Sequence, residues 1–272
     1  MSTPAPAVIW FEKLTRKDVP LVGGKNASLG EMVSNLDKRG VRVPGGFATT
    51  ADAYWHYVKA NGLHDTVSDT LGDLAAARIT LAEAGATIRK AFIKGEFPED
   101  LAAEIRSSYA ELCKRAGKDN VDVAVRTSAT AEDLPDASFA GQQETYLNIR
   151  GEAALLDACR RCYASLFTDR AISYRTVKKF DHMKVALSIG VQLMVRSDIG
   201  GSGVMFSLDT ETGFDKLVVI NAAWGLGENV VQGAVDPDEY EVFKPLLANE
   251  KLSPIIEKKL GAKSIKMIYA HG

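Results

Sequence analysis

The stretch VDVAVRTSATAEDLPDASFAGQQETYLNI, from Val121 to Ile149, reads as a strand, a long polar loop and a second strand. Its first three valines alternate with other residues, and this period of two places them in a core and Arg126 on the opposite face, at the end of the strand. The loop from Thr127 to Gln142 is rich in small and polar residues, and Thr145 to Ile149 resumes a strand pattern. We therefore expect Arg126 to lie where a sheet meets a long loop.

The length and composition of this loop favour a binding role. A loop of this length without structure of its own is uncommon in a compact domain unless it is a lid or a binding loop. Small hydroxyl residues beside a fixed arginine suit an anion with several oxygens, because guanidinium, hydroxyl and backbone N–H donors can converge on it. A solvated surface hairpin with an ordinary exposed arginine is the alternative interpretation.

The composition of the whole chain limits the classes of function. The 272 residues suffice for two subdomains, expected at 1–118 (rich in helices) and 119–272 (containing the sheet). A formal net charge of −2 with interspersed signs argues against a nucleic-acid surface. Neither a signal peptide nor a membrane span is recognisable. Three cysteines without a spaced framework indicate a reducing compartment, so a cytoplasmic location is expected.

A second motif, Gly23 to Lys25, precedes an expected helix. Glycines before a helix N-terminus favour a phosphate, because free N–H groups and the positive end of the helix dipole point at the ligand, and Lys25 adds a mobile charge. The segment is not a Walker A loop, since Val19 stands where a glycine is required and Asn26 replaces Ser or Thr. A simple strand-to-helix turn is the alternative. The helix itself is predicted from apolar spacing at Leu29, Met32, Val33 and Leu36.

The next segment, from Ala51 to Arg115, has helical spacing, and Pro98 opens its last helix. We expect His56 and His64 there to have surface or packing roles. Further on, a Cys-x-x-Cys pair falls on the apolar face of a predicted helix. We interpret Cys159 and Cys162 as buried structural residues, because a redox or zinc site would need an exposed first sulfur or a second ligand pair.

The clearest alternation in the chain runs from Val185 to Val195 and predicts a half-buried strand in the middle of an antiparallel sheet. We expect the turn at Asp198 to Gly203 to lead into a hairpin partner of that strand. Glu228, in a later glycine-rich stretch, is by default an exposed loop carboxylate. That stretch and the strands around it are expected at Leu217 to Ile220, Ala223 to Gly233 and Asp238 to Phe243.

Five blocks in the same order carry a family likeness: GGKNASLGEM, GVRVPGGF, VAVRTSATAEDLPDASFAGQQETYLNI, SLFTDRAISYR and AWGLGENVVQGAVDPDEY. Together they resemble the nucleotide-binding region of phosphoenolpyruvate synthases over nearly the whole chain. Pyruvate phosphate dikinases and rifampicin phosphotransferases share this region, but Asn26 and the long loop look more like the synthases. The resemblance implies an α+β, ATP-grasp-like fold with a helical N-terminal subdomain and a mainly antiparallel sheet subdomain.

The resemblance also implies a reaction. ATP would lie in a cleft between the two subdomains and pass a phosphoryl group to a histidine on a swivelling downstream domain. That phosphohistidine would phosphorylate pyruvate in a separate barrel, so that pyruvate, ATP and water give phosphoenolpyruvate, AMP and phosphate. Such a pyruvate, water dikinase would serve gluconeogenesis, with a homodimer as one arrangement of the full-length enzyme. The ATP-binding domain of a related dikinase or antibiotic phosphotransferase, or a nucleotide-binding module without turnover, is the alternative.

Matched to the family's motifs, Lys25 and Arg126 stand where the phosphates are contacted and are the expected catalytic residues. Magnesium is implied, but the segments that supply its ligands in the family do not occur before Gly272, so the metal ligands are expected beyond that residue. The same holds for the phosphorylated histidine, and the chain alone is expected to be inactive. The expected nucleotide-binding set is Lys25, Arg126, Thr127, Ser128, Gly141, Gln192, Met194 and Val195.

Overall fold

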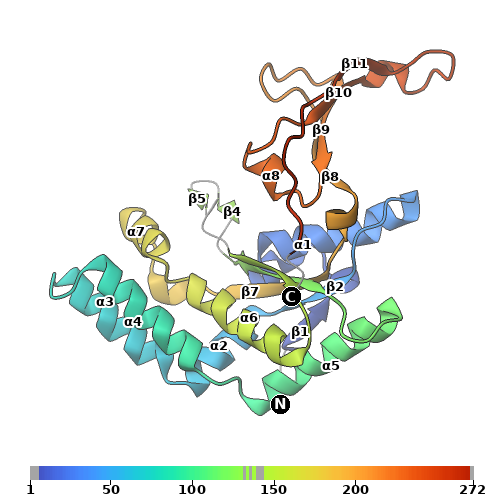
Figure 1. Ribbon diagram of the computed structural model, residues 1–272. Helices are drawn as coiled ribbons and strands as arrows, with labels where there is room; N and C mark the ends of the chain where they lie inside the picture. The colour runs from blue at the N-terminus through green and yellow to red at the C-terminus, as the bar shows by residue number, and fades with distance from the viewer. Residues whose placement is uncertain (1–5, 131–132, 135–136, 139–143, 270–272) are drawn as a thin grey trace. The chain divides into compact units, whose positions relative to one another are not determined.

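The computed structural model describes residues 6–130, 133–134, 137–138 and 144–269. The chain forms two compact units, Met1–Met194 and Val195–Gly272. The first contains helices and a five-stranded sheet, and the second is built on a four-stranded sheet (Figure 1). The strand pairs within both sheets are antiparallel in the described part of the chain. The α+β class expected from the sequence is confirmed.

The sheet of the first unit has the strand order β1-β2-β7-β3-β6. Strands β7 and β3 therefore lie in its interior, and each pairs with a neighbour on both sides. Two further short strands, β4 and β5, pair with each other. The bounds are Val8–Trp10 (β1), Gly46–Thr49 (β2), Val123–Ala129 (β3), Asp133–Leu134 (β4), Ala137–Ser138 (β5), Thr145–Ile149 (β6) and Leu187–Leu193 (β7).

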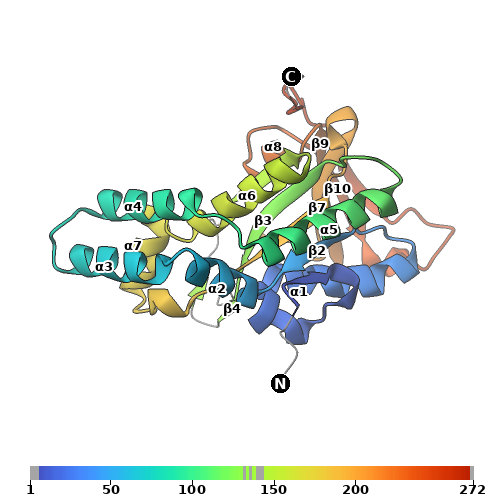
Figure 2. The ribbon, with the colours of Figure 1, turned by 90° about the horizontal axis from the view of Figure 1, so that it is seen from below.

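Helices cover both faces of this sheet. Figure 1 shows α1 on one side of β2 and β7, and Figure 2 shows α2, α5 and α6 lying across the other side. The helical segment expected from Ala51 to Arg115 is confirmed as the four helices α2 to α5. The bounds are Val19–Leu36 (α1), Ala51–Ala60 (α2), Leu63–Ala75 (α3), Leu81–Lys94 (α4), Glu99–Ala116 (α5), Glu152–Ser165 (α6) and Asp169–Val177 (α7).

Two hydrophobic clusters hold these layers together. The larger cluster joins one face of β3 and β7, including Val125 and Ile189, to the apolar faces of α2 to α6. The smaller cluster lies under α1 and includes Ala48 of β2. Strand β7 is buried along almost its whole length, not half-buried as its alternation suggested. The reason is that α1 covers the face on which its small and polar residues lie.

The loop expected to begin at Thr127 begins later. Strand β3 continues through Ala129, because its pairing with β7 runs without a break from Val123 to that residue. Arg126 is consequently in the middle of a strand, not at its end. The rest of the predicted loop contains β4 and β5, and its residues 131–132, 135–136 and 139–142 lie outside the described part of the chain.

The boundary between the compact units also differs from the division expected after residue 118. Strands β1 and β2 precede that position, yet they belong to the same sheet as β7. The helix-rich N-terminal part and the first sheet therefore share one unit, and the division falls between Met194 and Val195. A sheet built from distant segments cannot be divided by composition along the sequence.

The second unit is an antiparallel meander with the order β11-β10-β9-β8. The segment expected to pair with the 185–195 strand instead forms β8, which pairs with β9, because both edges of β7 are already occupied by β2 and β3. The expected glycine-rich loop contains the end of β9 and the short helix α8. The bounds are Gly201–Phe206 (β8), Leu217–Trp224 (β9), Glu228–Val231 (α8), Asp238–Phe243 (β10) and Ile255–Lys259 (β11).

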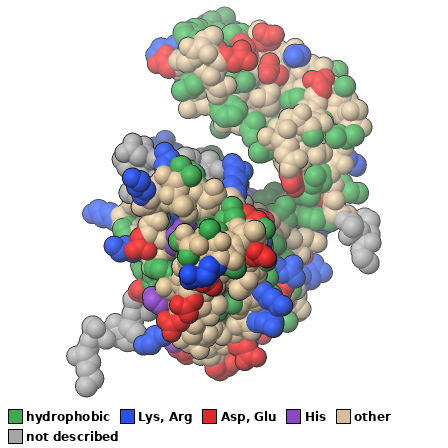
Figure 3. Space-filling model, turned by 90° about the vertical axis from the view of Figure 1, so that its left-hand side faces the viewer, with side chains coloured by type: hydrophobic (Ala, Val, Ile, Leu, Met, Phe, Trp, Pro, Cys, Tyr) green, Lys and Arg blue, Asp and Glu red, His purple; other side chains and the backbone are tan. Residues whose placement is uncertain are grey.

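The surface shows no single dominant charge on the face seen in Figure 3, where acidic and basic side chains both occur. None of the helices in the described residues is long and apolar enough to cross a membrane. Short 3-10 helices complete the chain at Phe11–Lys13, Arg16–Asp18, Asp37–Arg39, His182–Lys184, Ser197–Ile199 and Lys244–Leu246.

Candidate functional site

Helix α1 contains a break at Gly23, whose φ of 74° and ψ of 163° are not helical, while the backbone on both sides is. Only glycine adopts this conformation without strain. A methyl group here would lie 2.6 Å from the carbonyl oxygen of Ser128 on β3. The expected glycine-led helix start is therefore present, as a second helical segment that begins directly after Gly23 and lies against the sheet.

Asn26 is fixed in the first turn after this break. It is 1% exposed, and its backbone N–H donates to Ser128 Oγ at 3.3 Å. Its Nδ2 donates to Ser188 Oγ at 2.8 Å, and that hydroxyl donates to the carbonyl oxygen of Thr49 at 2.5 Å. One of the N–H groups freed by the break is thus used inside the protein, and Lys25, the residue before Asn26, remains exposed.

Arg126 projects from the same sheet face as Ser128, since the two residues are two positions apart on β3. The residue opposite Arg126 on β7 is Gly190, which has no side chain, and Arg126 Nη2 donates to Gln192 Oε1. The Nε of Arg126 is buried without a hydrogen-bond partner, and burial lowers the pKa of the guanidinium. Among the described residues, no carboxylate lies within ion-pair distance of Arg126.

Gln192 holds Arg126 through a neutral amide. The side chain is 7% exposed, and its Nε2 donates to the carbonyl oxygen of Pro44 at 2.9 Å, which leaves Oε1 for the guanidinium. Met194 ends the first unit, and its backbone N–H donates to the carbonyl oxygen of Asp122 at 3.0 Å. Val195 begins the second unit and is 60% exposed.

The two expected hydroxyl ligands occupy internal positions. Thr127 is 1% exposed and lies on the face of β3 that carries Val125, toward the larger cluster, and its Oγ1 has no hydrogen-bond partner among the described residues. Ser128 is fully buried and accepts from the backbone of Asn26. Gly141 lies outside the described residues. A ligand role for these three residues stays a prediction.

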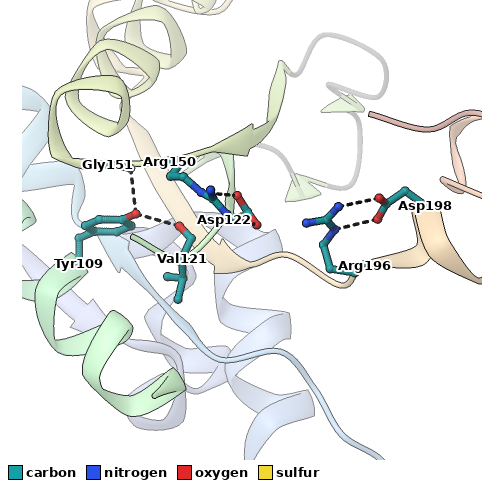
Figure 4. Close-up of polar contacts among 7 residues, drawn as sticks. All are labelled: Tyr109, Val121, Asp122, Arg150, Gly151, Arg196 and Asp198. Carbon is teal, nitrogen blue, oxygen red and sulfur yellow. Dashed lines mark hydrogen bonds and ion pairs between the residues drawn. The ribbon is translucent and has the colours of Figure 1, made fainter. Parts of the chain in front are cut away.

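The start of β3 is anchored to the surrounding helices. Figure 4 shows Tyr109 of α5 between two backbone groups: its hydroxyl donates to the carbonyl oxygen of Val121 at 2.8 Å and accepts from the N–H of Gly151 at 2.9 Å. Beside it, Arg150 Nε donates to Asp122 Oδ1 at 2.9 Å. These contacts fix the strand that carries Arg126 against α5 and α6.

Two residues that the sequence reasoning did not single out support the candidate site. Ser188 and Gly190 lie on the same face of β7 as Gln192; the first binds Asn26, and the second has no side chain, so the Asn26 amide can lie against the strand. The alternation from Val185 to Val195 already placed Ser188, Gly190 and Gln192 on one face. A glycine and a serine in the middle of a central strand were the signal that another element approaches closely.

The described residues contain no group of three or more His, Cys, Asp or Glu side chains that could hold a metal ion. Glu228 begins the short α8, and its carboxylate accepts from Gln232 Nε2 at 2.9 Å. Cys159 and Cys162 are both fully buried, as expected, and burial raises the pKa of each thiol. The surface role expected for His56 is also confirmed. Its Nε2 lies 3.0 Å from Asp100 Oδ1, and both side chains are exposed.

The arrangement suits an anion with several oxygens. Lys25 is an exposed residue of the helical segment that begins after the Gly23 break, and Arg126 brings a guanidinium whose partner is a neutral amide. Both elements contact each other through Asn26 and Ser128, so the two cations belong to one local structure. No carboxylate that the structure describes pairs with Arg126, so its full charge can act on a ligand.

The family described as "Pyruvate phosphate dikinase, AMP/ATP-binding domain" matches residues 19–272. Phosphoenolpyruvate synthase of Synechocystis sp. is 56% identical over 97% of this chain and 33% of the relative. Phosphoenolpyruvate synthase of Escherichia coli is 54% identical over 98% of this chain and 33% of the relative. A probable phosphoenolpyruvate synthase of Methanocaldococcus jannaschii is 45% identical over 96% of this chain and 21% of the relative.

The chain thus spans about a third of the length of the first relatives. The sequence similarity to phosphoenolpyruvate synthases extends over almost the whole chain. The chain therefore belongs to the family described as pyruvate phosphate dikinase, AMP/ATP-binding domain.

Proposed function

We propose that this chain binds ATP and that Lys25 and Arg126 hold its phosphates. The observation that carries the proposal is the mostly buried guanidinium of Arg126, which has a neutral amide as its side-chain partner and no carboxylate within ion-pair distance in the described ranges. A buried cation is costly unless it is paired. A phosphate group supplies the missing negative charge and accepts two parallel hydrogen bonds from a guanidinium.

Lys25 complements Arg126 in this proposal. Its ammonium group is a compact charge on a flexible stem, which can follow a phosphoryl group as it moves, whereas Arg126 is held in one orientation by Gln192. Phosphoryl transfer is catalysed mainly by positioning and by neutralising charge on the transferred group. One fixed and one mobile cation supply both without a nucleophile on the protein.

Gln192, Met194 and Val195 are proposed to lie beside the adenine. The support is their match to the family's hinge strand, together with the position of Gln192 next to Arg126. In this proposal, Gln192 has two roles, because its side chain orients the guanidinium while its strand forms one wall for the base. Thr127, Ser128 and Gly141 complete the proposed nucleotide contacts.

For the whole protein, we propose the reaction that the relatives' name describes. This chain would supply the ATP-binding part of a cytoplasmic pyruvate, water dikinase, and downstream domains would supply the phosphorylated histidine and the pyruvate-binding barrel. The basis is 54–56% identity to phosphoenolpyruvate synthases from several bacteria over almost the entire chain. The proposal places the protein in pyruvate metabolism in the gluconeogenic direction.

Magnesium enters this proposal only as a companion of the nucleotide. The residues that the structure describes do not offer a set of carboxylates or histidines to hold it, and the partners around Arg126 are amides and hydroxyls. Magnesium at a nucleotide site is usually held by one or two carboxylates together with the phosphates, and the described partners of Arg126 include no carboxylate. We therefore assign no step of the reaction to a metal held by these residues.

The first experiment measures ATP binding to the chain by isothermal titration calorimetry. Arg126→Ala and Lys25→Ala should each weaken ATP binding by roughly tenfold or more, since a charge-assisted hydrogen bond contributes about 1.5–3 kcal/mol. The matched controls are Arg78→Ala, whose exposed guanidinium pairs with Asp73, and Lys90→Ala on the exposed face of α4. Unchanged affinity in both site variants would refute the assignment.

The second experiment tests the proposed reaction in a full-length enzyme. This chain replaces the matching third of the Escherichia coli relative, and AMP and phosphoenolpyruvate formation from ATP and pyruvate is followed by chromatography. We expect pyruvate-dependent formation of both products, and its loss with Arg126→Ala. A chimera that binds ATP but forms neither product would instead favour the module without turnover.

A further inference from the structure

We propose that Asn26 is a positioning residue of the nucleotide site, which sets the distance and direction of Lys25 relative to Arg126. The inference rests on the proposed function, because it concerns the same site. Asn26 itself is 1% exposed and is not a candidate for direct contact with a ligand. It acts through its neighbour in the sequence, Lys25, and through the strands to which it is bound.

The contacts of Asn26 reach three neighbouring strands. Its backbone N–H donates to Ser128 of β3, its Nδ2 donates to Ser188 of β7, and Ser188 in turn donates to the carbonyl oxygen of Thr49 on β2. Because the proton of Ser188 is used toward Thr49, its oxygen acts as the acceptor for Asn26. This fixes the orientation of the amide, with Nδ2 toward Ser188.

Two glycines show how close this contact is. At Gly23, an added methyl group would collide with the side chain and backbone of Ser128, and at Gly190 it would collide with Oδ1 of Asn26 and lie 3.3 Å from its Cγ. The helix start therefore lies against the sheet with no room for a side chain between them. A contact of this kind transmits small displacements, since packed interiors deform little.

The geometry of a helix links Asn26 to Lys25. Successive residues of an α-helix point about 100° apart around its axis, so the direction of a fixed residue determines that of its neighbour. With Asn26 held on β7, Lys25 leaves the helix toward solvent. Arg126 projects from β3 on the sheet face that α1 covers, two residues before Ser128. The two cations are thus held in register by the Asn26 contacts.

The amide of Asn26 is not optimised for stability alone. Its Oδ1 is buried without a hydrogen-bond partner among the described residues. A buried unsatisfied acceptor is uncommon in folded proteins and calls for a reason beyond folding. The contact with Ser188 provides one, because it uses Nδ2 of the amide and leaves Oδ1 beside Gly190, which offers no side-chain donor.

The test is a double-mutant cycle in which ATP affinity is measured by calorimetry and stability by urea unfolding. Asn26→Ala should weaken ATP binding by about tenfold in the original chain. In a Lys25→Ala background it should weaken binding by less than about twofold, since the loss of affinity acts through Lys25. Asn35→Ala is the matched control, because Asn35 lies on the same helix and its amide contacts only exposed groups of Glu31. We expect it to leave ATP affinity unchanged.

Ser188→Ala provides a second route if Asn26→Ala does not fold, because it removes the acceptor of Asn26 and keeps the amide. It should reproduce the loss of ATP affinity and the dependence on Lys25. An equal loss of affinity in both backgrounds would show that Asn26 has a merely structural role, and no loss in either background would also overturn the inference.

The outcome for the inference is separable from that for the proposed function. If Lys25→Ala alone leaves ATP affinity unchanged, the proposed phosphate site is wrong. If Lys25→Ala weakens ATP binding while Asn26→Ala and Ser188→Ala do not, the phosphate site stands and the positioning role of Asn26 is wrong.

Discussion

Arg126 donates from Nη2 to the side-chain oxygen of Gln192 on the neighbouring strand, so a mostly buried cation has a neutral partner in place of a carboxylate. Gln192 is in turn held by the carbonyl oxygen of Pro44, which orients its amide. This pair keeps the guanidinium in place without neutralising it. The distinction between an amide and a carboxylate at residue 192 is therefore the point at which orientation and charge can be separated by experiment.

Gln192→Glu should weaken ATP binding by about tenfold or more, because the new carboxylate would pair with Arg126 and compete with a phosphate of ATP. The matched variant Gln192→Met removes the acceptor but leaves the guanidinium charged. It should therefore bind ATP more tightly than Gln192→Glu does. Calorimetric titration of both variants checks the order, and equal affinity of Gln192→Glu and the original chain would contradict the proposed role of Arg126.

A second prediction concerns the anchor of β3. Tyr109→Phe removes a hydroxyl that binds the carbonyl oxygen of Val121 and the N–H of Gly151, and both backbone groups would lose their partner. We expect the free energy of unfolding to fall by about 1–3 kcal/mol. Urea unfolding followed by circular dichroism measures it. Tyr240→Phe, at a partly exposed position on β10, is the control and should change it by less than about 0.5 kcal/mol.

The local patterns in the sequence predicted the elements better than their pairing. Alternation located β3, β7 and β10, and helical spacing located the helices from α2 to α5, because these patterns reflect which side of one element is buried. The partner of β8 was predicted wrongly. A hairpin is the default for consecutive strands, but β7 was already paired on both sides by strands from distant parts of the chain.

The charged residues of the candidate site were singled out from the sequence, and their role remains a proposal, whereas the residues that support them were missed. Lys25 and Arg126 were recognisable from the glycines and small polar residues near them. Ser188 and Gly190 were not, because their role depends on α1 lying over β7, which is a contact between segments more than 150 positions apart. The internal positions of Thr127 and Ser128 have the same cause, since β3 continued through residues whose composition is typical of a loop.

A third prediction concerns the buried thiols. Burial raises the pKa of Cys159 to about 12 and that of Cys162 well above its usual value, so almost no reactive thiolate is present near neutral pH. In a Cys113→Ser background, reaction with a disulfide reagent should occur only when the protein unfolds. Adding Ala60→Cys, on the exposed end of α2, provides a fast-reacting control. Rapid labelling of the two native thiols under native conditions would contradict their structural role.

The last prediction concerns pH. His182 Nδ1 accepts from Arg175 Nε at 2.9 Å, so the folded protein requires the neutral imidazole. Burial, with a further contribution from the charge of Arg175, lowers the pKa of His182 from its ordinary 6.5 to about 4. Between these values the unfolded chain binds more protons than the folded chain, and the free energy of unfolding therefore rises with pH.

The contribution of His182 is fully present above pH 6.5 and is lost as pH falls toward 4. His182→Gln, which cannot titrate, should consequently lose less stability than the original chain when urea unfolding is compared at about pH 7 and about pH 5. His64→Gln is the control, since the His64 side chain is 64% exposed, and it should follow the original chain. An identical pH dependence in His182→Gln and the original chain would show that the Arg175 contact does not hold His182 neutral, because the difference between the two proteins arises only from that proton.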